Sequence, residues 1–125
     1  MILDTNALSA FADGSPQTGV ALRDAVNVAI PVIVLGEYRY GVRHSTRRRE
    51  YEAWLERNLP TFRVLEITTE TALVYSAIRS ELRALGKPIP ANDAWIAALC
   101  RQHDLPILSR DRHFDHVKGL RRLAW

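Results

Sequence analysis

Cysteine and long apolar runs are scarce in this chain. Its 125 residues contain one cysteine, Cys100, so no disulfide can form within the chain. No apolar stretch approaches the roughly 20 residues of a membrane-spanning helix. No basic segment followed by an apolar run precedes the first expected strand. We therefore expect a cytoplasmic protein that does not associate with membranes.

Repeats, linkers and low-complexity segments are also missing. Hydrophobic residues make up 47% of the chain, which is enough for a buried core and argues against disorder. At this length we expect one folding unit that covers residues 1–125.

Short apolar runs typical of β-strands alternate with segments of helical period. The expected strands are 1–3, 26–30, 62–67, 105–108 and, more weakly, 120–125. The clearest helices are one around 51–59 that ends at Pro60, one capped by Thr68 or Thr69 and closed by Gly86, and one capped by Asn92 that runs to about His103.

Residues 31–35 fit either a longer second strand or the start of a helix. Valine and isoleucine favour the strand, but Pro31 suits a first helical turn, and the spacing of Ile33, Glu37 and Tyr40 suits a helix with Glu37 on its inward face. We predict the helix. Strands that alternate with helices then predict an α/β fold with a parallel central sheet of four or five strands flanked by helices.

Four acidic residues stand out within this fold. Asp4 and Asp111 follow the first and fourth apolar runs, at the sheet edge where α/β proteins place functional sites. Glu37 and Asp93 lie among apolar residues, where a carboxylate is costly to bury without a cation. A shared divalent metal ion would account for all four. Oxygen ligands without a cysteine–histidine cluster favour Mg²⁺ or Mn²⁺ over zinc.

Each acid taken alone has another explanation. Asp4 suits a helix N-cap, Glu37 could bond to a tyrosine or an arginine, and Asp93 would interact favourably with a helix N-terminus. Asp111 suits a turn or an ion pair with a neighbouring arginine. The metal hypothesis rests on the four acids together, because an α/β fold would bring all four to one edge of the sheet. The acids that do not fit this pattern, and that we expect on the surface, are Asp13, Asp24, Asp104 and Asp115.

The balance of charge is mildly basic, with 17 lysines and arginines against 14 acids. If four acids bind metal, ten remain against those 17 basic residues. A basic body around an acidic pocket suits a polyanionic substrate, although many small domains are mildly basic for no such reason.

The four motifs together resemble those of PIN-domain ribonucleases, in particular the VapC-type toxins of type II toxin–antitoxin (VapBC) systems. They occur in the family's order and cover nearly the whole chain, at residues 2–6, 36–41, 92–97 and 108–114. The resemblance implies a PIN-like three-layer fold and a metal-dependent endoribonuclease that acts as a toxin. It also implies a homodimer and a small antitoxin that blocks the acidic pocket.

The resemblance also suggests a role for each site residue. Asp4, Asp93 and Asp111 would hold Mg²⁺ or Mn²⁺, with Glu37 as a fourth ligand or as the group that orients the attacking water. The side chains expected to orient these carboxylates are Thr5, Asn6 and Ser109.

One residue departs from the family pattern. Many members carry a further aspartate where this chain has His113, and Mg²⁺ prefers oxygen to nitrogen ligands. His113 suits a phosphate contact or Mn²⁺ better, so we leave it outside the metal set. The basic residues that we expect to hold RNA are Arg43, Arg110, Arg112 and His113, although each could instead belong to a solvated face.

Two other functions compete with the nuclease. The first is a PIN-like module with a weakened site that binds RNA or a protein without cutting, and His113 is its best support. The second is a receiver-type signalling domain, which usually needs a second acid beside the first one. Asp4 lacks that neighbour. A phosphatase or a DNA nuclease would share the metal chemistry and is not excluded by sequence.

Overall fold

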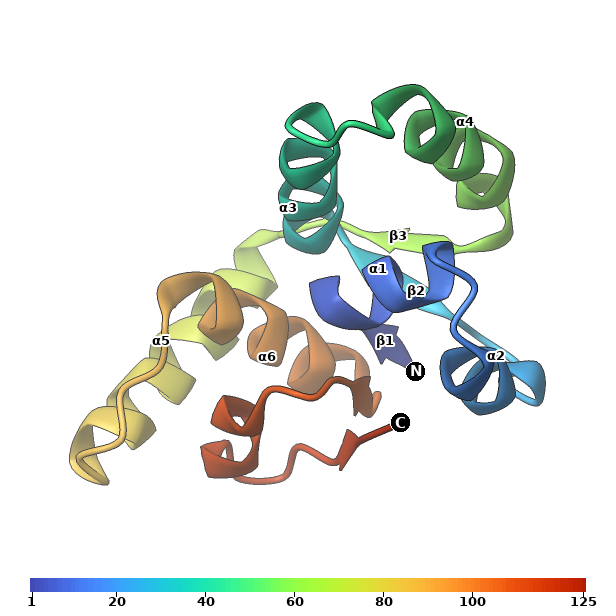
Figure 1. Ribbon diagram of the computed structural model, residues 1–125. Helices are drawn as coiled ribbons and strands as arrows, with labels where there is room; N and C mark the ends of the chain where they lie inside the picture. Colours follow the sequence, from blue (N-terminus) through green and yellow to red (C-terminus); the bar gives the residue numbers. More distant parts are fainter.

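The computed structural model describes residues 1–125 (Figure 1). Strands and helices alternate along the chain, as predicted. In chain order the elements are β1 (Ile2–Leu3), α1 (Thr5–Ala12), α2 (Pro16–Arg23), β2 (Ala29–Pro31), α3 (Val32–Arg43), α4 (Arg48–Asn58), the 3-10 helix η1 (Leu59–Thr61), β3 (Arg63–Leu65), α5 (Thr69–Ala84), α6 (Ala91–His103), β4 (Ile107–Leu108), the 3-10 helix η2 (Arg112–His116) and β5 (Arg122–Leu123).

The five strands form one parallel sheet in the order β3-β2-β1-β4-β5. At its centre Leu3 of β1 is paired with Leu108 of β4. The residues that follow these two strands, Asp4 and Ser109, therefore leave the sheet side by side. The predicted α/β fold with a parallel sheet flanked by helices is confirmed.

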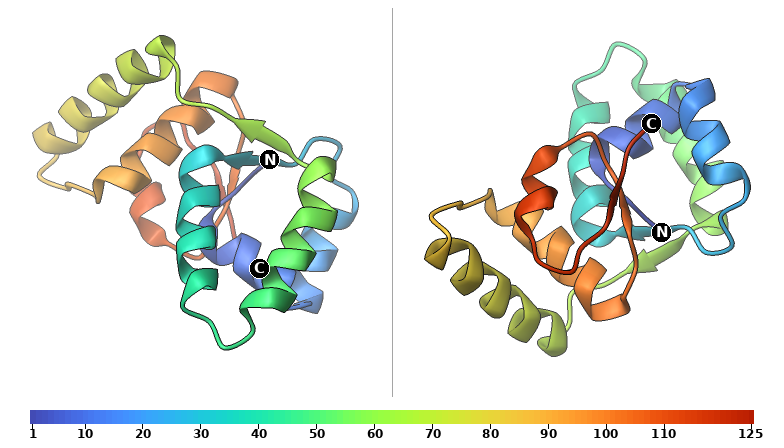
Figure 2. Two further views of the ribbon diagram at one scale, coloured as in Figure 1. Left: turned by 90° about the horizontal axis from the view of Figure 1, so that it is seen from above. Right: turned by 90° about the horizontal axis from the view of Figure 1, so that it is seen from below.

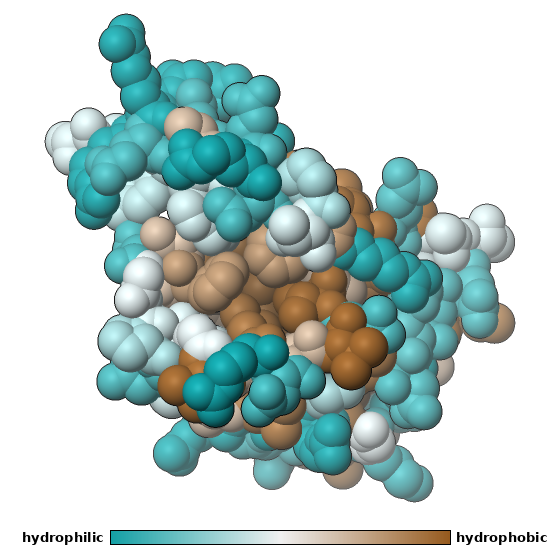
Figure 3. Space-filling model, turned by 90° about the vertical axis from the view of Figure 1, so that its right-hand side faces the viewer, coloured by the Kyte–Doolittle hydropathy of each residue, from teal (hydrophilic) through white to brown (hydrophobic).

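The helices form two groups around this sheet (Figures 1 and 2). Helices α5 and α6 lie side by side and form the most extensive helix pair, while α1, α3 and α4 contact one another in the second group. Helix α6 also contacts α3 and η2, so it connects the two groups. On the face that carries α2 and α4, apolar side chains gather in a hollow (Figure 3).

Local sequence explains where the helices begin. Helix α5 starts with a capping box in which Thr68 and Thr71 each bond the other's backbone N–H, so the predicted cap is confirmed. Helix α3 starts at Val32, directly after Pro31, which is the last residue of β2. The choice of a helix over a longer strand is therefore right.

Two predicted boundaries are wrong. Strand β2 is shorter and later than the expected 26–30, and Val26 is 92% exposed. Asn92 does not cap α6, because the carbonyl of Pro90 already accepts the first helical bond, from the N–H of Ala94. Pro90 has the extended backbone of an N-cap, so α6 begins at the next residue and Asn92 lies within its first turn.

The core holds most of the large apolar side chains, and Cys100 lies within it. Burial raises the pKa of the Cys100 thiol, so this side chain lacks the reactive thiolate of a nucleophilic cysteine. Trp95 of α6 stacks on Tyr75 of α5 with ring centroids 3.8 Å apart. Trp54 of α4 meets the edge of Phe11 of α1. No helix is long and apolar enough to cross a membrane.

Candidate metal centre

Asp4 is held by its own helix and by the neighbouring strand end. It is the N-cap of α1, and one of its carboxylate oxygens accepts from the N–H of Thr5 at 2.8 Å. Its other oxygen accepts from Asn6 Nδ2 at 3.1 Å and from Ser109 Oγ at 2.6 Å. The side chain is thus both a helix cap and a rigidly oriented, buried carboxylate.

Ser109 links two of the acids. Its side chain is fully buried; it donates to Asp4 and accepts from the backbone N–H of Asp111 at 2.9 Å. The side-chain carbonyl of Asn6 accepts from the backbone N–H of Arg110, which ties the same loop to α1. The three residues expected to orient the carboxylates therefore all bond to an acid of the set, and Thr5 is the third of them.

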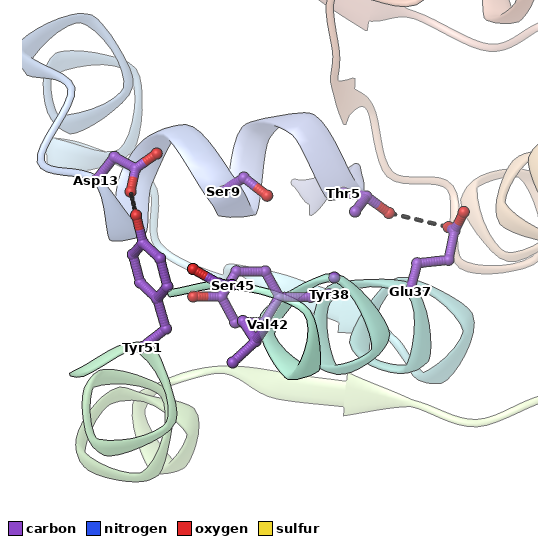
Figure 4. Close-up of a pocket in the computed structure, with 9 residues that line it drawn as sticks. Thr5, Ser9, Asp13, Glu37, Tyr38, Val42, Ser45 and Tyr51 are labelled. Atoms are coloured by element: carbon purple, nitrogen blue, oxygen red, sulfur yellow. Dashed lines mark hydrogen bonds between the residues drawn. The ribbon is translucent and has the colours of Figure 1, made fainter. Parts of the chain in front are cut away.

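Thr5 connects α1 to α3. Its hydroxyl donates to Glu37 Oε1 at 2.9 Å, so Glu37 lies beside the start of α1 (Figure 4). The prediction that Glu37 shares an inward face with Tyr40 is wrong, because Tyr40 is 68% exposed. The inward residues of α3 follow the i, i+4 spacing of Val34, Tyr38 and Val42, which turns Glu37 to the rim.

Asp93 and Asp111 meet across the ring of His113. Asp93 lies in the first turn of α6, and its Oδ2 is 3.2 Å from His113 Nδ1. Asp111 caps η2, accepting from the backbone N–H of His113 at 2.9 Å, and its Oδ1 is 3.1 Å from the same ring nitrogen. Ligand atoms of these three residues all lie within 4.8 Å of one another.

Burial and mutual repulsion set the electrostatics of the cluster. Burial raises the pKa of Asp4 above its ordinary 3.8, the hydrogen bonds from Ser109 and Thr5 lower it, and the charges of Glu37 and Asp111 raise it. Burial is also the main cause that raises the pKa of Asp93, opposed by its bond with His113. The charges of Asp111 and Asp4 raise the pKa of Asp93 further.

No arginine or lysine lies within ion-pair distance of the set. Every arginine ion pair in the protein is made with an acid outside it, and only His113 lies within ion-pair distance of a member. The carboxylate oxygens, with one imidazole nitrogen among them, form a donor set that fits a divalent cation. Asp93, Asp111 and Asp4 could hold such an ion, with Glu37 at the rim.

The basic residues expected to hold RNA are spread around this edge. Arg110 lies over the ring of Trp125, 4.5 Å from its centroid, and Arg112 is exposed on η2. Arg43 is exposed at the end of α3, about 9 Å along the helix axis from Glu37 at 1.5 Å per residue. Arg43 is therefore not a direct neighbour of the acids.

A cavity that sequence reasoning missed extends from Glu37 along α1 and α3 (Figure 4). Its volume is about 290 Å³, and the hydroxyl of Tyr38, a lining residue, is buried without a partner. At its far end Tyr51 donates to Asp13 at 2.6 Å, so this expected surface acid has a specific partner. The remaining lining residues are Thr5, Ser9, Gly41, Val42 and Ser45.

The chain matches known proteins over nearly its full length. The family model described as PIN domain matches residues 1–120. Toxin FitB of Neisseria gonorrhoeae is 33% identical over an alignment of 121 residues. The alignment covers 89% of this chain and 87% of FitB. Ribonuclease VapC5 of Mycobacterium tuberculosis is 28% identical, over 94% of this chain and 87% of VapC5.

A solved structure shows the same fold. The crystal structure of DNA-bound VapBC from Salmonella typhimurium has a TM-score of 0.88 at 25% identity, with 99% of this chain and 96% of the solved chain covered. With the family match over residues 1–120, these similarities establish that the chain belongs to the PIN-domain family.

Proposed function

We propose that this protein is a metal-dependent endoribonuclease that hydrolyses phosphodiester bonds in RNA and acts as the toxin of a VapBC-type toxin–antitoxin pair. The observation that carries the proposal is the convergence of Asp4, Glu37, Asp93 and Asp111 on one sheet edge with no lysine or arginine within ion-pair distance of them. The similarity to a protein named as a toxin and to one named as a ribonuclease supports it.

Asp4, Asp93 and Asp111 hold Mg²⁺ or Mn²⁺ in this proposal. When bound, the ion polarises the scissile phosphate and lowers the pKa of a bound water. Glu37, at the rim and fixed by Thr5, is placed to orient the attacking water or to add a ligand. Ser109, Asn6 and Thr5 hold the carboxylates in place, as metal sites usually require.

RNA is held by basic side chains around the acidic edge. Arg110 and Arg112 flank Asp111 in sequence, and His113 is half-exposed beside it, so we expect these three side chains to contact a phosphate that binds near Asp111. Arg43, at the end of α3, would bind the RNA at a greater distance from the acids.

Protein partners follow from the same proposal. We expect a homodimer and a complex with an antitoxin protein, supported by the likeness to the solved VapBC chain. The cytoplasmic location expected from the sequence stays a prediction.

The alternative is a PIN-domain module that binds RNA or a protein without cutting. The observation that favours it is His113, whose ring nitrogen lies within hydrogen-bond distance of both Asp93 and Asp111. Metal-dependent turnover decides between the two functions.

The test is cleavage of a panel of structured RNAs by purified protein with Mg²⁺ or Mn²⁺. Asp93→Asn is the most suitable site variant, because Asp93 caps no helix and its replacement keeps the shape of the side chain. Asp24→Asn is the matched control, since its side chain is 89% exposed and remote in sequence from the motifs. We expect cutting by the native protein and the control, and none by Asp93→Asn or in EDTA. RNA binding without cutting would favour the module.

A further inference from the structure

The ring nitrogen of His113 occupies an unusual position between two carboxylates. Nδ1 lies 3.2 Å from Asp93 Oδ2 and 3.1 Å from Asp111 Oδ1. These carboxylates come from different elements, the first turn of α6 and the cap of η2. The Nδ1 atom of His113 thus contacts one carboxylate from α6 and one from the start of η2.

A hydrogen bond from Nδ1 cannot satisfy both carboxylates. Nδ1 carries at most one proton, so it can donate a straight hydrogen bond to only one of the two carboxylates. Asp93 and Asp111 are partly buried, with side chains 16% and 32% exposed, and no arginine or lysine lies within ion-pair distance of them. A cation that bonds to all three groups would satisfy them together.

The spacing matches that of ligands on one ion. Adjacent ligands of an octahedral ion with bonds of about 2.1 Å lie about 3.0 Å apart. The two observed separations from Nδ1, 3.1 and 3.2 Å, are close to this edge length. The backbone that carries the ring is also held in place, because the backbone N–H of His113 bonds to Asp111 and the next residue, Phe114, is fully buried.

We propose that Nδ1 of His113 is itself a ligand of the metal ion held by Asp93 and Asp111, and that this nitrogen makes the site prefer Mn²⁺ over Mg²⁺. The inference rests on the proposed function and deepens it. Mg²⁺ takes oxygen ligands and resists losing its water, whereas imidazole suits transition-metal ions, so an imidazole in the set shifts the preference. The ring proton then lies on Nε2.

Pulsed electron paramagnetic resonance on the Mn²⁺-loaded protein tests this directly. A coordinated imidazole gives a ¹⁴N coupling to the Mn²⁺ spin, which we expect in the native protein and in His116→Ala, the matched control on the same 3-10 helix. We expect the coupling to vanish in His113→Ala and His113→Asp. A merely structural histidine would not produce this signal.

Competition between Mn²⁺ and Mg²⁺ gives a second readout. His113→Asp restores an all-oxygen set, so the ratio of Mn²⁺ to Mg²⁺ affinity should fall about tenfold or more, in line with the roughly 10–100-fold effects of altered metal environments. Two results together would overturn this inference and leave the proposed function intact: no ¹⁴N coupling in the native protein, and the same affinity ratio in His113→Asp as in the native protein. This outcome requires that Mn²⁺ binding still depends on Asp111. A native protein that binds neither ion would overturn the proposed metal-dependent function as well.

Discussion

Replacing Ser109 with alanine should weaken the fold and the site together. The Ser109 hydroxyl is fully buried between β4 and α1, where it donates to Asp4 at 2.6 Å and accepts from the N–H of Asp111 at 2.9 Å. Alanine fills nearly the same space, so the change removes two hydrogen bonds and leaves little cavity. Water cannot replace the hydroxyl at a fully buried position.

The expected loss of stability follows from these two bonds. A hydrogen bond to a charged group contributes about 1.5–3 kcal/mol and a neutral one about 0.5–1.5 kcal/mol, so the free energy of unfolding should fall by about 2–4.5 kcal/mol. The bond from Ser109 lowers the pKa of Asp4, against the burial that raises it. Removing it raises that pKa further. The loss should therefore be larger above the pKa of Asp4, where its carboxylate is charged, and smaller in acid.

Denaturant unfolding in EDTA at neutral and acidic pH measures this prediction. Ser76→Ala, at an exposed position of α5, is the control and should change stability by less than about 0.5 kcal/mol. Affinity for Mn²⁺ should fall by about 10–100-fold in Ser109→Ala, because the hydroxyl orients a proposed ligand. A loss of stability equal to that of the control, or one that is the same at both pH values, would refute the reasoning.

Three further predictions concern charge, RNA and the core. The pKa values of Asp4 and Asp93 are raised in the folded protein, so it binds more protons than the unfolded chain between about pH 3.8 and the raised pKa values. The free energy of unfolding of the metal-free protein should therefore fall as pH rises through this window. Asp93→Asn should make the free energy of unfolding less dependent on pH in denaturation assays. Arg112→Gln should weaken RNA binding and reduce the slope of log affinity against log salt by about 1, while Arg23→Gln leaves both unchanged in filter-binding assays. Phe114→Ala should cost about 3–5 kcal/mol in thermal unfolding, because its ring is fully buried beneath the Asp111–His113 turn.

The convergence of the acids could be predicted because it depends on chain order. Parallel strands linked by helices share one carboxyl edge, so Asp4 and Asp111 had to lie near each other once the alternation was recognised. Asp93 could be placed from a helix start, even though the start of α6 was misplaced beyond Pro90, whereas the helix was predicted correctly for Glu37 but its face was not. Errors of a residue or two at such boundaries do not move a side chain to another edge.

Other features depend on contacts that no local pattern encodes. The bond between Tyr51 and Asp13 joins residues 38 positions apart, and the cavity beside it depends on how α1, α3 and α4 pack. The position of the His113 ring depends on the docking of η2 against α6. The sequence marks His113 only as a departure from the family pattern, with no indication that it contacts both Asp93 and Asp111.

The most direct test of the central claim is the rate of RNA cleavage as a function of Mn²⁺ concentration after all metal has been stripped from the protein. The account predicts no cleavage without metal, a saturable rise with Mn²⁺ in the native protein, and no rise in Asp93→Asn at any concentration. Cleavage that persists in the stripped protein, or that rises equally in Asp93→Asn, would contradict it.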